Sequence, residues 1–484
     1  MAYITSRPAG DLIIACENGE IADVQRCLRN RANLNFKIGN GQTPLFVASK
    51  NGHSKVVKIL LQHEAEIDIQ DNDGYTPLMI ACENGHLDVV KVFLKYETKV
   101  NVAEKNCFRT LMEAFWKRSQ SREYVLIKQQ ALVNEKNKYG WTALNLACLK
   151  SHIEIVKTLI KHNADVDLCS NEGFTPLMVA CAEKHGSIVG VLLRHKALVN
   201  ERNKDGDTAL HMACQNGDVR IVRSLIEHNA DVSLSNNNGF TPLLTACFTA
   251  HSSIVDVLLW HGSLVNDRSK GGDTALHMAC RNGDVRIVRS LIEHNADVSL
   301  SNNNGVTPLL TACFNGHSLI VDVLLCHGSL VNERNKGGDT ALHMACQNGD
   351  VRIVRSLIEH NADVNLSNKK GFTPLLTACF NAHSSIVDVL LYHGSLVNER
   401  NKDGDTALHR ACQNGYVEIV RNLIAHNADV NLSNNNGFTP LLTACFNGHS
   451  LIVDVLLCHG SLVNERNKGG DTALHMAVGM VTLK

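Results

Sequence analysis

Histidine and cysteine are the chemically capable side chains that this sequence holds in large number. The chain has 24 histidines and 17 cysteines among its 484 residues. Imidazole and thiolate groups bind zinc, and both act as catalytic groups. The sequence nevertheless has no Cys-x-x-Cys pair, no His-Glu-x-x-His motif, no phosphate-binding loop and no Gly-x-Ser-x-Gly elbow. These absences argue against catalysis and against a bound cofactor.

Twelve of the cysteines recur at one phase, at intervals of 33 residues or twice 33. They are Cys16, Cys82, Cys148, Cys181, Cys214, Cys247, Cys280, Cys313, Cys346, Cys379, Cys412 and Cys445. Helices of neighbouring units pack roughly 8–10 Å apart, beyond the ~7 Å between Cα atoms that a disulfide spans. We therefore interpret these cysteines as small buried apolar residues, with metal or redox chemistry as the alternative. Reduced thiols predict a cytoplasmic location, with the nucleus as the alternative.

Most histidines also fall at fixed phases. One group follows Thr-Ala-Leu and another follows glycine: His211, His277, His343, His409 and His475 in the first, and His53, His86, His317 and His449 in the second. This periodicity favours a structural role for the histidines over a catalytic one.

The whole chain repeats with the same period. A glycine two residues before a threonine recurs at intervals of 33 or 66: Gly41, Gly74, Gly140, Gly173, Gly206, Gly239, Gly272, Gly305, Gly338, Gly371, Gly404, Gly437 and Gly470. Seven of the eight prolines share one phase. Self-similarity at such a period is the sequence signature of a stacked-repeat fold.

Each unit predicts two short helices, as residues 305–337 illustrate. Thr307 and Pro308 predict a helix start, because threonine caps free N–H groups and proline suits the first helical position. Asn315-Gly316 predicts its end, and a second helix with one apolar face follows from Ser318. Neither helix can bury that face alone, so the units must stack as a solenoid. Pairs such as Asn304-Gly305 predict tight hairpin turns between units.

These units resemble ankyrin repeats. The resemblance is carried by GYTPLMIACENGHLDVVKVFL from Gly74 and by GDTALHMACQNGDVRIVRSLIEHNADVNL from Gly338. It implies an all-α ankyrin-repeat solenoid of about fifteen repeats, made of short helix pairs with β-hairpin loops. It also implies that the histidines of the Thr-Ala-Leu-His group form hydrogen bonds that tie the turns of neighbouring repeats.

The repeats divide the chain into five predicted segments. They are an N-terminal capping-type repeat at 1–40, repeats at 41–106, a degenerate repeat at 107–139, repeats at 140–469 and an incomplete repeat at 470–484. From Gly206 onward a pair of repeats is duplicated, so units opening GDTALH alternate with units opening GFTPLL or GVTPLL. The incomplete last repeat suggests either a fragment of a longer protein or an end covered by a partner.

Composition narrows the class of partner. The chain has 47 basic and 48 acidic side chains, whereas nucleic-acid binders usually carry a basic surplus. No stretch approaches the ~18 consecutive apolar residues of a membrane span, and the first residues do not resemble a secretory signal. We expect other proteins as partners, with no nucleic acid and no membrane insertion; the oligomeric state is left open.

The resemblance implies binding through hairpin tips and first helices, on the concave side of the stack. By phase, the second type of repeat places apolar residues there and the first type places aspartates: Phe240, Phe248, Val306, Phe314, Phe372, Phe380, Phe438 and Phe446, then Asp207, Asp273, Asp339 and Asp405. Exposed aromatic side chains predict a protein interface. The alternative is that the phenylalanines pack against the neighbouring hairpin.

The degenerate repeat at 107–139 departs most from the pattern. Cys107 replaces the glycine and Arg109 the threonine. We interpret it as a decayed repeat that acts as a hinge. The alternative is a basic aromatic patch for an acidic or phosphorylated partner, which includes Trp116, Arg118 and Arg122.

The resemblance also implies a modification, since ankyrin repeats are substrates of asparaginyl hydroxylase at hairpin asparagines. Asn365 and Asn431, each with leucine eight residues earlier, fit that pattern. The alternative is that these asparagines only support the turn.

For the chain as a whole we expect a non-enzymatic scaffold or adaptor. The alternatives are the recognition part of a larger signalling protein, such as an NTPase, kinase or ubiquitin-ligase subunit, and a membrane–cytoskeleton linker.

Overall fold

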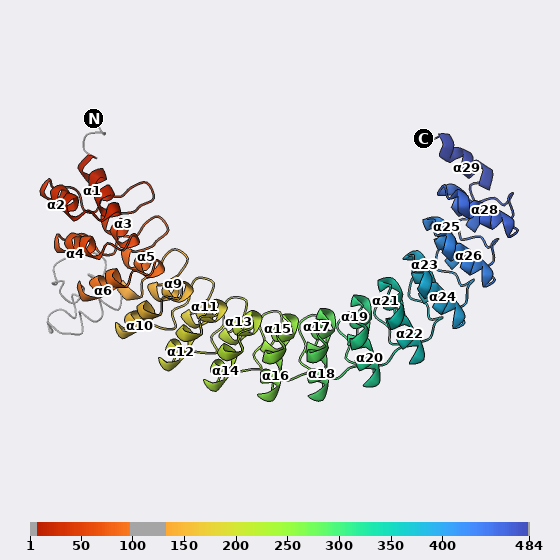
Figure 1. Ribbon diagram of the computed structural model, residues 1–484, viewed down its shortest axis with the longest axis horizontal. Helices are drawn as coiled ribbons and strands as arrows, with labels where there is room; N and C mark the ends of the chain where they lie inside the picture. Colours follow the sequence, from red (N-terminus) through yellow and green to blue (C-terminus); the bar gives the residue numbers. More distant parts are fainter. Residues whose placement is uncertain (1–6, 97–131, 483–484) are drawn as a thin grey trace, which may run out of the picture. The chain divides into compact units, whose positions relative to one another are not determined.

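Short helix pairs stacked in sequence order make up the computed structural model, which describes residues 7–96 and 132–482. The chain forms two compact units, 1–245 and 246–484. Figure 1 labels the helices, of which the odd-numbered are the first and the even-numbered the second of each repeat. The described residues contain helices and turns and no strand, so the all-α solenoid is confirmed.

The helices of the first unit are α1 (Arg7–Asn18), α2 (Ile21–Arg29), α3 (Pro44–Lys50), α4 (Ser54–Gln62), α5 (Pro77–Glu83), α6 (Leu87–Tyr96), α9 (Ala143–Leu149), α10 (Ile153–Lys161), α11 (Pro176–Ala182), α12 (Gly186–Arg194), α13 (Ala209–Asn216) and α14 (Val219–Glu227). The division between the units falls within α15 (Pro242–Phe248).

The helices of the second unit are α16 (Ser252–Trp260), α17 (Ala275–Asn282), α18 (Val285–Glu293), α19 (Pro308–Asn315), α20 (Ser318–Cys326), α21 (Ala341–Asn348), α22 (Val351–Glu359), α23 (Pro374–Phe380), α24 (Ser384–Tyr392), α25 (Ala407–Asn414), α26 (Val417–Ala425), α27 (Pro440–Phe446), α28 (Ser450–Cys458) and α29 (Ala473–Thr482).

Local sequence signals begin and end these helices as predicted. In α19 the Thr307 hydroxyl accepts a hydrogen bond from the Leu310 N–H, and Pro308 occupies the first turn. Gly316 ends the helix with a φ of 77°, in the left-handed region that glycine adopts without strain. The same unit therefore repeats with little variation along the chain.

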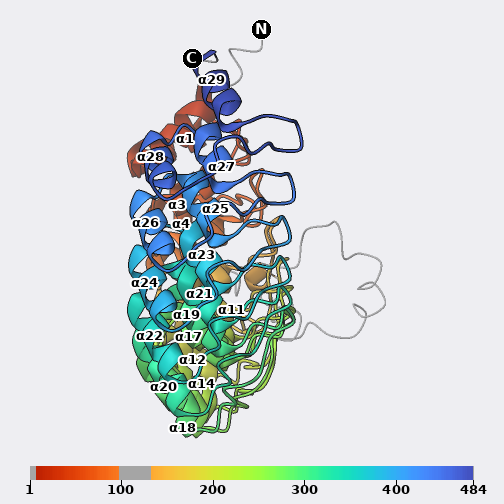
Figure 2. The ribbon, with the colours of Figure 1, turned by 90° about the vertical axis from the view of Figure 1, so that its right-hand side faces the viewer.

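Stacking supplies the core that one repeat lacks. Leu309, Cys313, Ile320 and Leu324 are at most 1% exposed, because α19 and α20 contact the corresponding helices of the next repeat, α21 and α22. In the second unit the second helices, the first helices and the loops form three successive layers (Figure 2). No described helix is long and apolar enough to cross a membrane.

The loops turn tightly and touch from one repeat to the next. In the loop before α19, the Asn302 N–H donates to the carbonyl oxygen of Val306 at 2.9 Å, and the Asn302 side chain accepts from the N–H groups of Asn304 and Val306. The Lys336 N–H of the following loop donates to the Asn304 carbonyl oxygen at 2.8 Å. The loops thus form a continuous hydrogen-bonded row within each unit without extended strands.

At one junction of the first unit, the two repeats in contact lie about two repeat lengths apart in the sequence. The Lys138 N–H donates to the carbonyl oxygen of Asp73 at 3.1 Å, and His152 Nε2 lies 3.0 Å from the carbonyl oxygen of Glu83. Elsewhere these contacts join residues of consecutive repeats, but here the partners are 65 and 69 residues apart. Helix α5 contacts α9, and α6 contacts α10. The degenerate repeat predicted at 107–139 lies mostly outside the described residues, and its role as a hinge stays a prediction.

Candidate functional site

Four phenylalanines in the last turns of first helices are half exposed. Phe248, Phe314, Phe380 and Phe446 have 48–53% of their surface accessible, and they recur every 66 residues in α15, α19, α23 and α27. We call these four residues the aromatic row. All four lie in the second unit. The hairpin residues of the same predicted group, Phe240, Val306, Phe372 and Phe438, are only partly exposed.

The hairpin rings support the rings of the aromatic row. Phe372 and Phe380 pack edge to face with ring centroids 6.3 Å apart, and Phe438 and Phe446 do so at 6.0 Å. The guanidinium of Arg410, from the next repeat, lies 5.3 Å from the ring centre of Phe372. The hairpin rings are therefore largely held by their surroundings, while half of each ring in the aromatic row faces solvent.

The predicted aspartates bind their own stack. Oδ1 of each one accepts a hydrogen bond from an asparagine side chain in the loop that leads into the following repeat, at 2.6–2.7 Å. The pairs are Asp207–Asn236, Asp273–Asn302, Asp339–Asn368 and Asp405–Asn434. Asp405 retains only 9% of its accessible surface. Each aspartate thus joins its own loop to the next one, a role that repeat phase alone did not predict.

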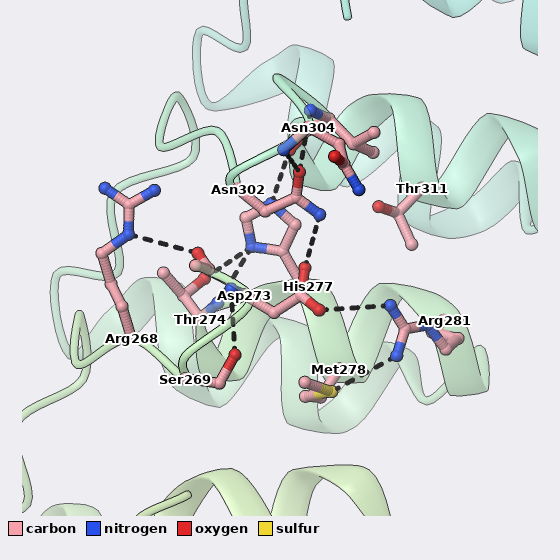
Figure 3. A network of polar contacts seen from close by, with 12 residues as sticks. Arg268, Ser269, Asp273, Thr274, His277, Met278, Arg281, Asn302, Asn304 and Thr311 are labelled. Atoms are coloured by element: carbon pink, nitrogen blue, oxygen red, sulfur yellow. Dashed lines mark hydrogen bonds and ion pairs between the residues drawn. The ribbon is translucent and has the colours of Figure 1, made fainter. Parts of the chain in front are cut away.

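Arginines of the first helices bind two of these carboxylates. In α17, Arg281 Nη2 donates to Asp273 Oδ2 at 3.4 Å, as Figure 3 shows. In α25, Arg410 Nη2 lies 3.0 Å from Asp405 Oδ2. Arg410 and Asp405 also line a shallow pocket of about 400 Å³, together with Phe438 and the exposed Phe446. Charged and aromatic groups therefore meet on the face formed by hairpins and first helices.

Four of the five histidines of the Thr-Ala-Leu-His group tie neighbouring repeats, as the resemblance implied. Nδ1 of His277 accepts from the Thr274 N–H at 3.1 Å, and Nε2 lies 2.9 Å from the carbonyl oxygen of Val306 (Figure 3). His211, His343 and His409 make the same contacts at 2.9 Å with the following repeat. Burial lowers the pKa of all four, against the opposing effect of the bond to the carbonyl oxygen.

The second histidine group has a role that sequence reasoning missed. His317 Nε2 lies 3.3 Å from the carbonyl oxygen of Arg281 in the preceding repeat, and its ring covers Gly283. A Cβ on Gly283 would lie 2.5 Å from that ring. The same contact joins His86 with Gly52. The recurrence of Gly and His at a fixed separation was the signal in the sequence.

The twelve periodic cysteines are buried and unbridged, as predicted. Burial raises the pKa of thiols such as those of Cys82, Cys148 and Cys181, and Cys313 lies near the thiols of Cys280 and Cys346 in the adjacent repeats. The Cys326 and Cys458 thiols, outside that phase, are exposed. Among the residues described at 7–96 and 132–482, no group of three histidine, cysteine or acidic side chains is arranged to hold a metal ion.

The remaining predicted residues divide into two sets. Asn365 and Asn431 lie in the loops, where the side chain of Asn365 accepts from the Leu396 N–H at 2.8 Å and that of Asn431 accepts from the Leu462 N–H at 2.9 Å. Trp116, Arg118 and Arg122 lie outside the described residues.

Comparison with known proteins agrees with the repeat architecture. The family described as ankyrin repeats, in units of three copies, matches residues 12–104, 111–203, 195–269, 255–335, 327–401, 393–467 and 432–481. A search of curated proteins finds no match to this sequence. Ankyrin repeats are protein–protein interaction modules and are generally non-enzymatic. Because the family matches nearly the whole length, this chain belongs to the ankyrin-repeat family.

Proposed function

We propose that this protein is a non-enzymatic scaffold or adaptor that binds partner proteins on the face formed by its hairpins and first helices. The observation that carries the proposal is the aromatic row: four phenylalanines, each about half exposed, on successive first helices of one type. Large aromatic side chains contribute strongly to protein interfaces, because burying them removes much apolar surface from water.

The surroundings of the row support the same proposal. Phe446 borders a shallow pocket whose lining also includes the charged groups of Asp403 and Arg410. An apolar anchor beside a few oriented polar groups suits a partner that buries its own apolar side chains there.

Partner capture with a matched control tests the proposal. The intact chain is compared with a variant that carries Phe→Ser at all four positions of the aromatic row, in lysate of the native cell. A control variant carries Leu→Ser at four leucines that have the same 66-residue spacing and lie after the second helices: Leu264, Leu330, Leu396 and Leu462, with 53–61% of their surface exposed. Circular dichroism establishes that both variants fold.

We expect a partner that the intact chain and the leucine variant retain and that the phenylalanine variant loses. With the purified partner, the phenylalanine variant should bind at least about tenfold more weakly, since one such factor corresponds to about 1.4 kcal/mol. Equal binding by the intact chain and the phenylalanine variant would exclude the aromatic row as the interface.

Hydroxylation of Asn365 and Asn431 stays a prediction from the family resemblance. In both loops the amide oxygen accepts a hydrogen bond from the next repeat. We infer that an enzyme would need the loop to open locally before it reached either side chain. Mass spectrometry of the protein isolated from its native cell tests for the modification.

A further inference from the structure

Arg410 occupies a receptor for a guanidinium group, formed by its own repeat and the preceding one. Its Nη2 lies 3.0 Å from Asp405 Oδ2 and 3.5 Å from Asp403 Oδ2, and its Nη1 donates to Gln413 Oε1 at 2.9 Å. The guanidinium carbon lies 5.3 Å from the centre of the Phe372 ring. Two carboxylates, an amide oxygen and an aromatic face are groups that a guanidinium prefers as neighbours.

A second repeat shows that a methionine does not prevent this contact. The three repeats of the same type that precede Arg410 have methionine at its position: Met212, Met278 and Met344. In one of them, Arg281 reaches over from the end of α17. Its Nη2 donates to Asp273 Oδ2 at 3.4 Å, and its Nη1 lies 3.7 Å from the sulfur of Met278 (Figure 3). A guanidinium therefore reaches the carboxylate with the methionine in place.

The same receptor residues recur around the start of the repeat at 206–238, where no arginine stands at the position of Arg410. Residues 201–217 and 399–415 are identical except that Met212 stands where the later copy has Arg410. Asp205, Asp207 and Gln215 correspond to the two carboxylates and the amide that Arg410 contacts. In the preceding repeat, Phe174 corresponds to Phe372 and is likewise partly exposed.

The carboxylate of Asp207 has one oxygen available in the structure. Oδ1 accepts from Asn236 Nδ2 at 2.7 Å, whereas no residue of the described part of the chain makes a hydrogen bond or ion pair with Oδ2. The copy that opens at Gly338 differs, because Asp339 Oδ2 accepts from Asn335 Nδ2 at 3.3 Å and Val306 replaces the phenylalanine of the preceding repeat. Asp207 is therefore the copy that combines a second carboxylate, a preceding aromatic ring and a free oxygen.

We propose that Asp207, with Asp205 and the ring of Phe174, receives an arginine side chain of a partner protein, in the position that Arg410 takes in its own repeat. This inference rests on the proposed function and gives the chemistry of one contact on that face. A guanidinium suits the site better than an ammonium group, because its planar fork donates to two acceptors while its flat face lies on an aromatic ring.

Methyl NMR of the full-length protein tests the inference at the site itself. The methionine ε-methyl groups are labelled with ¹³C, and the Met212 signal is assigned by its loss in Met212→Leu. The probe is N-acetyl-arginine-N′-methylamide, and the lysine and citrulline counterparts are titrated in parallel. We expect a saturable shift of the Met212 signal with the arginine probe alone, at concentrations on the order of millimolar for a single side chain.

Two aspartate variants provide a matched pair. Asp207→Asn keeps an oxygen that can accept from Asn236 but removes the charge, and it should weaken the response of Met212 at least about tenfold. Asp339→Asn makes the same change in the repeat where Oδ2 is already bonded, and it should leave the Met212 response unchanged. A Met212 signal that does not move, that moves equally with lysine or citrulline, or that responds normally in Asp207→Asn would overturn the proposal.

We expect a new site for the arginine probe when Arg410, which occupies the later copy, is replaced. Arg410→Met makes residues 399–415 identical to 201–217, so the introduced methyl group should shift with the arginine probe as Met212 does. Failure of that new signal to respond counts against the receptor as a whole.

The arginine inference and the proposed function can be contradicted independently of each other. A partner lost with the phenylalanine variant but bound equally by Asp207→Asn would contradict the arginine inference and leave the proposed function in place. Conversely, a Met212 response with no face-dependent partner would contradict the proposed function while the guanidinium receptor stands.

Discussion

We expect four buried histidines to make the stability of this protein dependent on pH. In His277, Nδ1 accepts the Thr274 N–H, so the neutral ring carries its proton on Nε2 and donates it to the Val306 carbonyl oxygen. Protonation would place a hydrogen on the accepting nitrogen and break the cap. Burial of the ring and the hydrogen bond that Nδ1 accepts disfavour the charged form, and they outweigh the bond to the carbonyl oxygen, so the pKa is lowered.

We predict that stability falls as the pH drops below the unfolded-state histidine pKa of about 6.5. The folded pKa is lowered, so the unfolded chain binds protons first, and each such histidine costs up to about 1.4 kcal/mol per pH unit until its folded pKa is reached. Above about pH 6.5 this stabilisation is fully present. Thermal unfolding between pH 7 and pH 5 measures the effect.

One repeat of this chain has asparagine in place of the buried histidine, which suggests a test variant. Asn145 occupies the same phase, where its Oδ1 accepts from the Thr142 N–H at 3.1 Å and its Nδ2 donates to the Phe174 carbonyl oxygen at 3.4 Å. Replacing the four histidines by asparagine should therefore flatten the pH dependence. Replacing four exposed histidines of equal spacing, His228, His294, His360 and His426, should leave it steep. An unchanged slope in the first variant would contradict the assignment.

The contact between glycine and histidine gives a second prediction at this scale. Gly283 and Gly328 have nearly equal φ values, 80° and 84°, but a Cβ on Gly283 would lie 2.5 Å from the His317 ring while one on Gly328 would meet nothing within 4 Å. Alanine at Gly328 should cost only the left-handed strain, about 1–2 kcal/mol.

Alanine at Gly283 should cost about 1–3 kcal/mol more, because the ring must move and lose its bond to the Arg281 carbonyl oxygen. Urea unfolding of the two variants measures the difference. Equal destabilisation would mean that the ring yields without cost.

At the scale of elements, a repeat is stable only through its neighbours, and the first unit shows which neighbours count. Helices α5 and α6 make with α9 and α10 the contacts that consecutive repeats make elsewhere. Stacking therefore follows complementary surfaces, and the chain length between two repeats matters little once those surfaces meet.

We predict that deleting residues 98–130 leaves the stack folded. The deletion restores a 33-residue interval between Gly74 and Gly140 and joins Glu97 to Ala131, which reproduces the pattern of residues 194–200. The contacts across this junction come from residues that the deletion retains. Circular dichroism and thermal unfolding should show the same helix content per repeat and an unfolding midpoint within a few degrees.

One substitution checks that the junction is the same in both chains. A Cβ on Gly85 would lie 2.6 Å from the His152 ring, so Gly85→Ala should destabilise the parent and the deletion variant equally. A deletion variant that unfolds without cooperativity, or that tolerates this alanine, would show that the intervening residues are needed to form the junction.

At the scale of the whole molecule, the periodic cysteines place one buried thiol in most repeats of both units. A buried thiol with a raised pKa is neither accessible nor ionised at neutral pH, so it reacts only when its repeat opens. The thiols of Cys326 and Cys458 are exposed and serve as internal references.

We predict that brief treatment of the native protein with iodoacetamide labels Cys326 and Cys458 and spares the twelve periodic cysteines. Increasing urea should then expose the buried thiols, and mass spectrometry of the peptides reports which repeats open first. Rapid labelling of Cys280 or Cys346 in the native protein would contradict the packing described for the core.

The sequence by itself was sufficient to predict the elements of the fold and much of the core. Thr307, Pro308 and Gly316 mark helix ends through interactions within one turn, and the phase of Cys313 predicts its burial. The bond of His277 to the next repeat followed from the family resemblance. These features depend on residues at fixed separations, and a periodic sequence displays fixed separations directly.

Only the tertiary structure decided how the surface groups are used. Phase placed Asp273 and Phe372 on one face, but the aspartate binds an asparagine of the next loop and the phenylalanine ring packs against Phe380. The direct contact of α5 with α9 could not be foreseen either, since an unbroken period suggests that every unit stacks in turn. Side-chain direction and the choice of neighbour depend on which surfaces meet in space, and separation along the chain does not specify them.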